Sequence, residues 1–188
     1  MASLVLSGDT SGSITVAAPS VAGSTTQTLV AVTGTLAPIV SGTAVSASST
    51  SVDFTGIPSW VKRITVMLSG VSTNGTSNLL IQLGTSGGVV SSGYVSGAWT
   101  SNTSNASSTA GVIITGVNTA AATHYGTALV CNISGNSWVT NYAGGWGTGS
   151  ADVGGGSITL GGTLDRVRIT TVNGTDTFDA GTINILYE

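Results

Sequence analysis

Charged side chains are scarce in this sequence. Of its 188 residues, Lys and Arg account for 4 and Asp and Glu for 7, so 6% of the chain is charged, against roughly 25% in an ordinary soluble domain. Nucleic-acid binding depends on clustered Lys and Arg side chains. The four basic residues form only two close pairs, Lys62 with Arg63 and Arg166 with Arg168. We therefore expect no nucleic-acid partner.

The shortage of charge does not indicate disorder. Hydrophobic residues still make up 40% of the chain, whereas disordered chains combine low hydrophobicity with high charge. Such a chain can build a core, but its surface must consist mainly of hydroxyl, amide and backbone groups. Weak electrostatic repulsion suits permanent packing against copies of itself or against other subunits.

Cysteine and histidine occur once each, and this excludes several kinds of site. Cys131 alone can form neither an intrachain disulfide nor a cysteine-based metal site within one chain. His124 lacks the sequence context of a nucleophile elbow, and we interpret it as a structural residue of a strand. Asp176 and Asp179 could in principle serve polysaccharide hydrolysis or bind calcium. Their turn-like surroundings favour hydrogen bonds to local backbone amides instead, so we predict no enzyme activity, no cofactor and no metal.

Long apolar runs are missing as well. No stretch approaches the ~18 continuous apolar residues of a membrane span, and residues 1–4 lack the basic start of a signal peptide. We expect a protein that is made in the cytoplasm and does not insert into a membrane.

Alternation of apolar residues with Thr, Ser and Gly runs through most of the chain, and this is the period of a β-strand. Turn signals recur every 8–12 residues or so, which is typical of a sandwich. The sequence predicts an all-β protein, an antiparallel β-sandwich or jelly-roll, with hairpins at residues 73–76 and 135–136. The predicted strands are residues 3–7, 13–17, 27–32, 51–54, 61–71, 78–83, 109–116, 124–133, 137–142, 157–160, 164–172 and 182–187.

The first 47 residues contain no aromatic side chain and almost no charge. A segment of this length without large side chains cannot build its own core. We expect residues 1–47 to form an extended N-terminal β arm that becomes ordered against other copies or a partner, and residues 48–188 to form a knob. In the knob, Arg166 and Arg168 are expected to pair with carboxylates such as Asp176 or Asp179, or across a subunit interface.

Three segments resemble bacteriophage and prophage tail-fibre proteins. Residues 7–16 (SGDTSGSITV), continuing to residue 35, are similar to the small-residue β repeats that precede fibre tips. Residues 51–64 (SVDFTGIPSWVKRI) and residues 164–184 (LDRVRITTVNGTDTFDAGTIN) resemble the beginning and end of a module at fibre C-termini. The resemblance implies a homotrimer in the virion with a β-sandwich tip and implies no catalytic residues. The chain is shorter than typical fibres, which leaves tail and capsid positions both open.

Aromatic residues supply the candidate binding surface. Trp138, Tyr142 and Trp146 lie in or beside a glycine-rich stretch, residues 144–149, that is expected to form a recognition loop. Tyr94 and Trp99 flank a polar segment, residues 101–108, expected at an exposed tip. The alternative is that Trp138 belongs to the core and Trp146 fills a subunit interface.

Two functions fit these features. The first is a tail-fibre or spike subunit, in which residues 1–47 bind other virion proteins and the knob contacts the host surface, with a host glycan as a candidate ligand. The second is a capsid decoration or head-fibre protein that stabilises or ornaments the shell. A spike that degrades polysaccharide is a third and weaker hypothesis.

Overall fold

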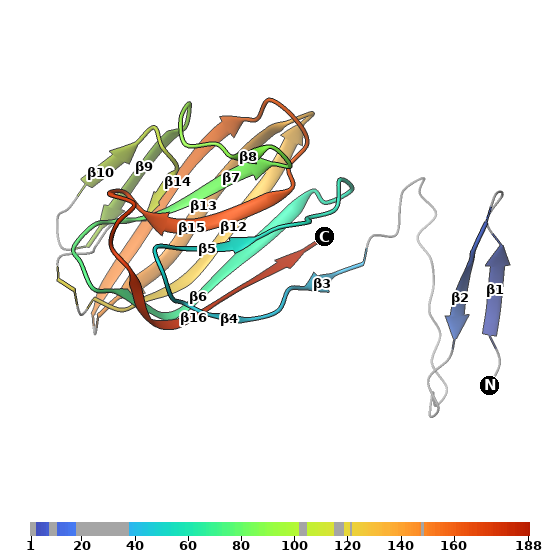
Figure 1. Ribbon diagram of the computed structural model, residues 1–188, viewed down its shortest axis with the longest axis horizontal. Coiled ribbons are helices and arrows are strands. Elements are labelled where there is room, and N and C mark those ends of the chain that lie inside the picture. The colour runs from blue at the N-terminus through green and yellow to red at the C-terminus, as the bar shows by residue number, and fades with distance from the viewer. Residues whose placement is uncertain are drawn as a thin grey trace. The chain divides into compact units, whose positions relative to one another are not determined.

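The computed structural model describes residues 3–7, 11–17, 38–101, 105–114, 119–120, 122–147 and 149–188. The chain divides into two compact units, Met1–Leu36 and Ala37–Glu188 (Figure 1). In the first unit, β1 (Ser3–Ser7) and β2 (Ser13–Ala17) pair as an antiparallel hairpin, which confirms the two strands predicted there. The strand predicted at residues 27–32 lies outside the described residues.

The second unit is an antiparallel β-sandwich, as the alternation predicted (Figure 1). Its larger sheet has nine strands, in the order β10 (Asn105–Ser108), β9 (Val95–Thr100), β14 (Ser150–Thr159), β13 (Ser137–Trp146), β12 (His124–Ser134), β6 (Arg63–Thr73), β16 (Phe178–Tyr187) and β3 (Val40–Ser41), with β4 (Val45–Ser46) also on β16. Its smaller sheet has five strands, in the order β11 (Val112–Ile114), β7 (Leu79–Thr85), β15 (Arg166–Thr171) and β5 (Ser51–Phe54), with β8 (Gly88–Val89) on β7.

The core lies between the two sheets. In β6, Ile64 and Val66 have no exposed surface, and Val167 and Ile169 of β15 are equally buried in the facing sheet. Each fully buried aliphatic side chain stabilises the fold by about 1.5–3 kcal/mol. Because strand side chains alternate between faces, the same pattern turns the intervening residues of β6 toward the outer face.

Residues 38–47 belong to the sandwich. β3 and β4 both pair with β16, the Ala47 amide donates to the Gly181 carbonyl at 2.9 Å, and Ala47 is buried in the core. The compact unit thus begins at Ala37, eleven residues before residue 48, where the knob was expected to begin.

The hairpin predicted at residues 73–76 is wrong, because β6 and β7 lie in different sheets. The Asn74 amide donates to the Thr177 carbonyl at 2.9 Å, and the Thr177 amide donates to Asn74 Oδ1 at 2.8 Å. The Asn-Gly segment is therefore held by a distant turn and carries the chain from one sheet to the other. The second predicted hairpin, at residues 135–136, is confirmed between β12 and β13.

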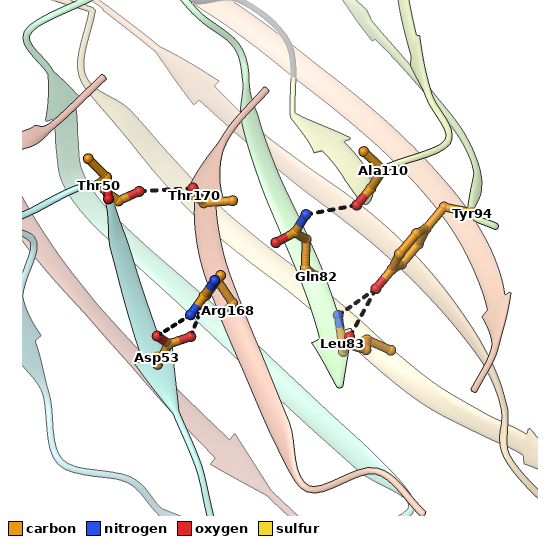
Figure 2. A network of polar contacts seen from close by, with 8 residues as sticks. All are labelled: Thr50, Asp53, Gln82, Leu83, Tyr94, Ala110, Arg168 and Thr170. Atoms are coloured by element: carbon orange, nitrogen blue, oxygen red, sulfur yellow. Dashed lines mark hydrogen bonds and ion pairs between the residues drawn. The ribbon is translucent and has the colours of Figure 1, made fainter. Parts of the chain in front are cut away.

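The side chain of Arg168 in β15 lies on the outer face of the five-stranded sheet (Figure 2). Arg168 donates from Nε and Nη2 to the two carboxylate oxygens of Asp53, at 2.7 and 2.8 Å. Gln82, in register with Arg168, donates from Nε2 to the Ala110 carbonyl at 2.9 Å. A row of polar contacts thus crosses β5, β15 and β7 and reaches the segment before β11.

The expected partners of the two arginines are corrected by these contacts. Arg168 pairs with Asp53, and Arg166 donates from Nη2 to its neighbour Asp165 at 3.0 Å. Asp176 instead accepts from the Ser77 amide and from Asn173 Nδ2. These two hydrogen bonds, the one from Asn173 first, lower the pKa of Asp176.

Tyr94 fills a gap at the edge of β7. Its hydroxyl accepts a hydrogen bond from the Leu83 amide at 2.6 Å and donates to the Leu83 carbonyl at 3.2 Å (Figure 2). The ring is 1% exposed, and burial, opposed by the Leu83 backbone, raises the pKa of Tyr94 to about 12. A tyrosine expected at the surface therefore completes the hydrogen bonding of the smaller sheet.

We predict that Tyr94→Phe lowers the free energy of unfolding by about 1–3 kcal/mol, because the buried Leu83 amide loses its acceptor. Urea unfolding followed by tryptophan fluorescence measures the change. Tyr125→Phe is the control, since the Tyr125 side chain is 44% exposed, and it should change stability by less than about 0.5 kcal/mol. Equal effects of both substitutions would contradict this role of Tyr94.

Candidate functional site

The five aromatic residues singled out in the sequence do not form one surface. Tyr94, Trp138 and Tyr142 are 1%, 4% and 2% exposed and pack in the sandwich core, so they are not available to a partner. Trp146 is half-buried and donates from Nε1 to Thr100 Oγ1 at 3.2 Å. Trp99 alone among the five is well exposed, at 49%.

The glycine-rich stretch is strand in its first half, since residues 144–146 belong to β13, whereas Gly147 and Gly149 are turn residues between β13 and β14. β13 and β14 pair without interruption from Ser137 opposite Thr159 to Trp146 opposite Ser150. Gly144 is required there because a Cβ atom would lie 2.2 Å from the Tyr142 hydroxyl. At Gly144, the sequence signal that suggested a recognition loop therefore reflects the close approach of a tyrosine ring to the strand.

Exposed apolar side chains gather on the outer face of the nine-stranded sheet. Trp99 of β9 lies in register with Val153 of β14, which is 48% exposed, and Val95 of β9 is 75% exposed. Val139 and Tyr125, on the same face of β13 and β12, are 41% and 44% exposed. We call this surface, defined by these five residues, the Trp99 face.

A shallow depression of about 440 Å³ lies on the Trp99 face. It is lined by Gly97, Ala98 and Trp99 of β9 and by Val153, Gly154 and Gly155 of β14. Gly97 and Gly155 lie opposite each other in the register, so no side chain rises between the two strands at that point. A second depression of about 460 Å³ lies at the beginning of β9, lined by residues 94–96 and 107–109.

The Trp99 face carries no charge on its four outermost strands. All residues of β9, β10, β13 and β14 are described, and Asp152 is the only Asp, Glu, Lys or Arg residue in these four strands. Asp152 is 1% exposed and points inward. An uncharged, partly apolar sheet face of this kind is typical of a contact surface.

A buried polar cluster lies on the inner face of the same strands. His124 of β12 and Asp152 of β14 are each 1% exposed, and His124 Nδ1 lies 3.7 Å from Asp152 Oδ2. Neither side chain has a hydrogen-bond partner among the described residues. The Tyr142 hydroxyl donates to the Tyr125 carbonyl at 3.2 Å, and burial, followed by the charge of Asp152, raises the pKa of Tyr142.

This cluster bears on the reading of His124 as a structural residue. The imidazole faces a carboxylate, as the base of a triad does, but both side chains are buried and do not line an open cleft. Elsewhere, Asp179 accepts from the Ser72 hydroxyl, and no group of three or more His, Cys, Asp or Glu in the described part of the chain could hold a metal ion.

We predict that His124→Leu and Asp152→Val each lower the free energy of unfolding by about 3–5 kcal/mol, because either change leaves a buried polar partner alone. The double variant should lose at least about 2 kcal/mol less free energy of unfolding than the two single losses added together, because it removes both polar groups. Urea unfolding of the four proteins gives this coupling. Additive effects would contradict a direct interaction between the two side chains.

The chain matches no protein family, no curated protein and no solved structure in the comparisons made. Within the described residues, no helix is long and apolar enough to cross a membrane.

Proposed function

We propose that this chain is a structural virion protein, a fibre or spike subunit whose knob contacts the surface of a host bacterial cell. The observation that carries the proposal is the Trp99 face, which exposes tryptophan, tyrosine and valine on strands without an outward charge. Apolar surface of this kind favours contact with another molecule over a purely solvated role. The resemblance of residues 51–64 and 164–184 to fibre-tip modules supplies the virion context.

The N-terminal hairpin supports an assembly role for the first unit. Val5, Leu6 and Val16 are 53%, 53% and 60% exposed, and the register places Leu6 and Val16 on one face of the hairpin. An isolated two-stranded hairpin is marginally stable in water. We infer that β1 and β2 pack against sister chains or another virion protein, which would bury these side chains, and that the assembly is a homotrimer.

The sandwich supports the division into attachment segment and knob. Residues 38–188 contain a continuous core to which both sheets contribute, so this part has the means to fold as a unit. In the hairpin, by contrast, Val5, Leu6 and Val16 are each more than half exposed. The hairpin thus requires contacts with other chains to bury its apolar side chains, whereas the sandwich can present a contact surface.

We predict that the full chain, of 18.4 kDa per subunit, forms a stable oligomer at micromolar concentration, and that Leu6→Asp lowers its association constant by about 100-fold or more. An uncompensated charge in a buried interface costs several kcal/mol. Analytical ultracentrifugation gives the mass, and circular dichroism checks that the sandwich is intact. Ser7→Asp, on the opposite face of the hairpin, is the matched control. A folded wild-type monomer would contradict the assembly role.

Location on the particle gives the second test. An antibody against the sandwich should label projecting fibres or spikes of purified particles, viewed by electron microscopy. Uniform labelling of the shell would favour capsid decoration instead, and absence of the protein from purified particles would rule out both functions.

A further inference from the structure

The register of the nine-stranded sheet places a glycine-floored groove on the Trp99 face. Asn141 of β13, Gly155 of β14, Gly97 of β9 and Ser107 of β10 lie in one row across four neighbouring strands. The two central residues have no side chain, whereas the two end residues carry an amide and a hydroxyl. The row is thus low in its middle and polar at its ends.

Larger side chains form the walls of this groove. Trp99 and Val153 stand in the next row on one side, and Val95 stands on the other side. Trp99 and Val95 are four residues apart along β9, so their Cα atoms are about 13 Å apart, and the four strands span about 14 Å. The depression that contains Gly97, Gly155 and Trp99 occupies about 440 Å³ of this space.

The chemistry of the groove selects an uncharged ligand. The side chains of its four strands that face outward include no Asp, Glu, Lys or Arg. A charged group bound there would lose hydration without gaining an opposite charge, and this is costly. Phosphates, sialic acids and acidic or basic peptides are therefore disfavoured.

The arrangement of its walls and ends suits a sugar ring. A pyranose has an apolar C–H face and a rim of hydroxyl groups, so it can lie on an indole while its hydroxyls bond to amide and hydroxyl side chains. Trp99 offers an indole that is 49% exposed, and Asn141 and Ser107 offer donors and acceptors at the two ends. Binding sites typically combine an apolar or aromatic lining with a few placed polar groups.

We propose that this groove binds a neutral oligosaccharide, with Trp99 as the stacking residue and Gly97 and Gly155 as its floor. The inference deepens the proposed contact with a cell surface and rests on it. A second copy of the chain is the other occupant that an uncharged face would accept, but a groove with polar ends and an open floor fits a narrow ligand better than the flat face of another sheet.

Gly97→Val gives a direct test, because it fills the groove and leaves Trp99 in place. A Cβ atom at Gly97 would meet only the Ala106 carbonyl oxygen, at 3.8 Å, so the fold should accept the change. The full-length wild type, Gly97→Val, Trp99→Ala and the control Val172→Ala are applied to an array of neutral and sialylated oligosaccharides. Val172 is 50% exposed and directly follows β15, a strand of the five-stranded sheet, so it is remote from the groove in the register.

We expect the wild type to bind neutral oligosaccharides and not their sialylated forms. Gly97→Val and Trp99→Ala should each weaken binding at least tenfold, and Val172→Ala should not change it, with affinities measured by titration calorimetry on the best array ligand. No binding by wild type, or equal binding by the groove variants, would overturn the inference. Dissociation of the oligomer by Gly97→Val in ultracentrifugation would also overturn it and assign the groove to a second copy. Particle labelling is a separate measurement. A failure of oligosaccharide binding therefore does not decide the proposed virion function, which is tested by the labelling alone.

Discussion

Packing of the five-stranded sheet on one face of the nine-stranded sheet decides which side chains are core and which meet solvent. Strand side chains alternate between faces, so burial of Ile64 and Val66 on the inner face fixes the outward direction of their neighbours. The same rule turns Tyr142 inward and Trp99 outward. A register shift of one residue would exchange the two sets, and the Trp99 face would no longer exist.

The two outer faces of the sandwich differ in chemistry. The five-stranded sheet carries the Arg168–Asp53 pair and the Gln82 contact, so its outer surface is occupied by polar groups that satisfy one another (Figure 2). The nine-stranded sheet presents valine, tryptophan and glycine over β9 and β14 without a charge. The exposed Arg63 of the same sheet lies on β6, separated from β13 by β12, so β9 and β14 present no outward charge, while the buried His124 and Asp152 lie beneath the Trp99 face.

Sequence reasoning was sufficient for the fold class and insufficient for the site. Alternation predicted most strands, and it predicted them best where long strands such as β6 and β12 carry large residues. It missed β9 and β10, because Gly97, Ser96 and Asn105 have low strand propensity and gain their order from pairing. The aromatic residues were identified by type alone, and only their burial in the folded chain showed that Tyr94 and Tyr142 point inward. The Asn-Gly step at residues 74–75 predicted a hairpin that is absent, because a local turn signal does not reveal that Asn74 bonds to the distant Thr177.

Solvent footprinting of Trp99 tests the central claim most directly. Hydroxyl-radical labelling with mass spectrometry would compare the isolated protein with the protein on particles attached to host cells. The account predicts that Trp99 and Val153 are labelled in the isolated protein and protected on attachment, while Val172 is labelled equally in both. Equal labelling of Trp99 in the two states would contradict the claim that this uncharged sheet face is where the protein makes contact.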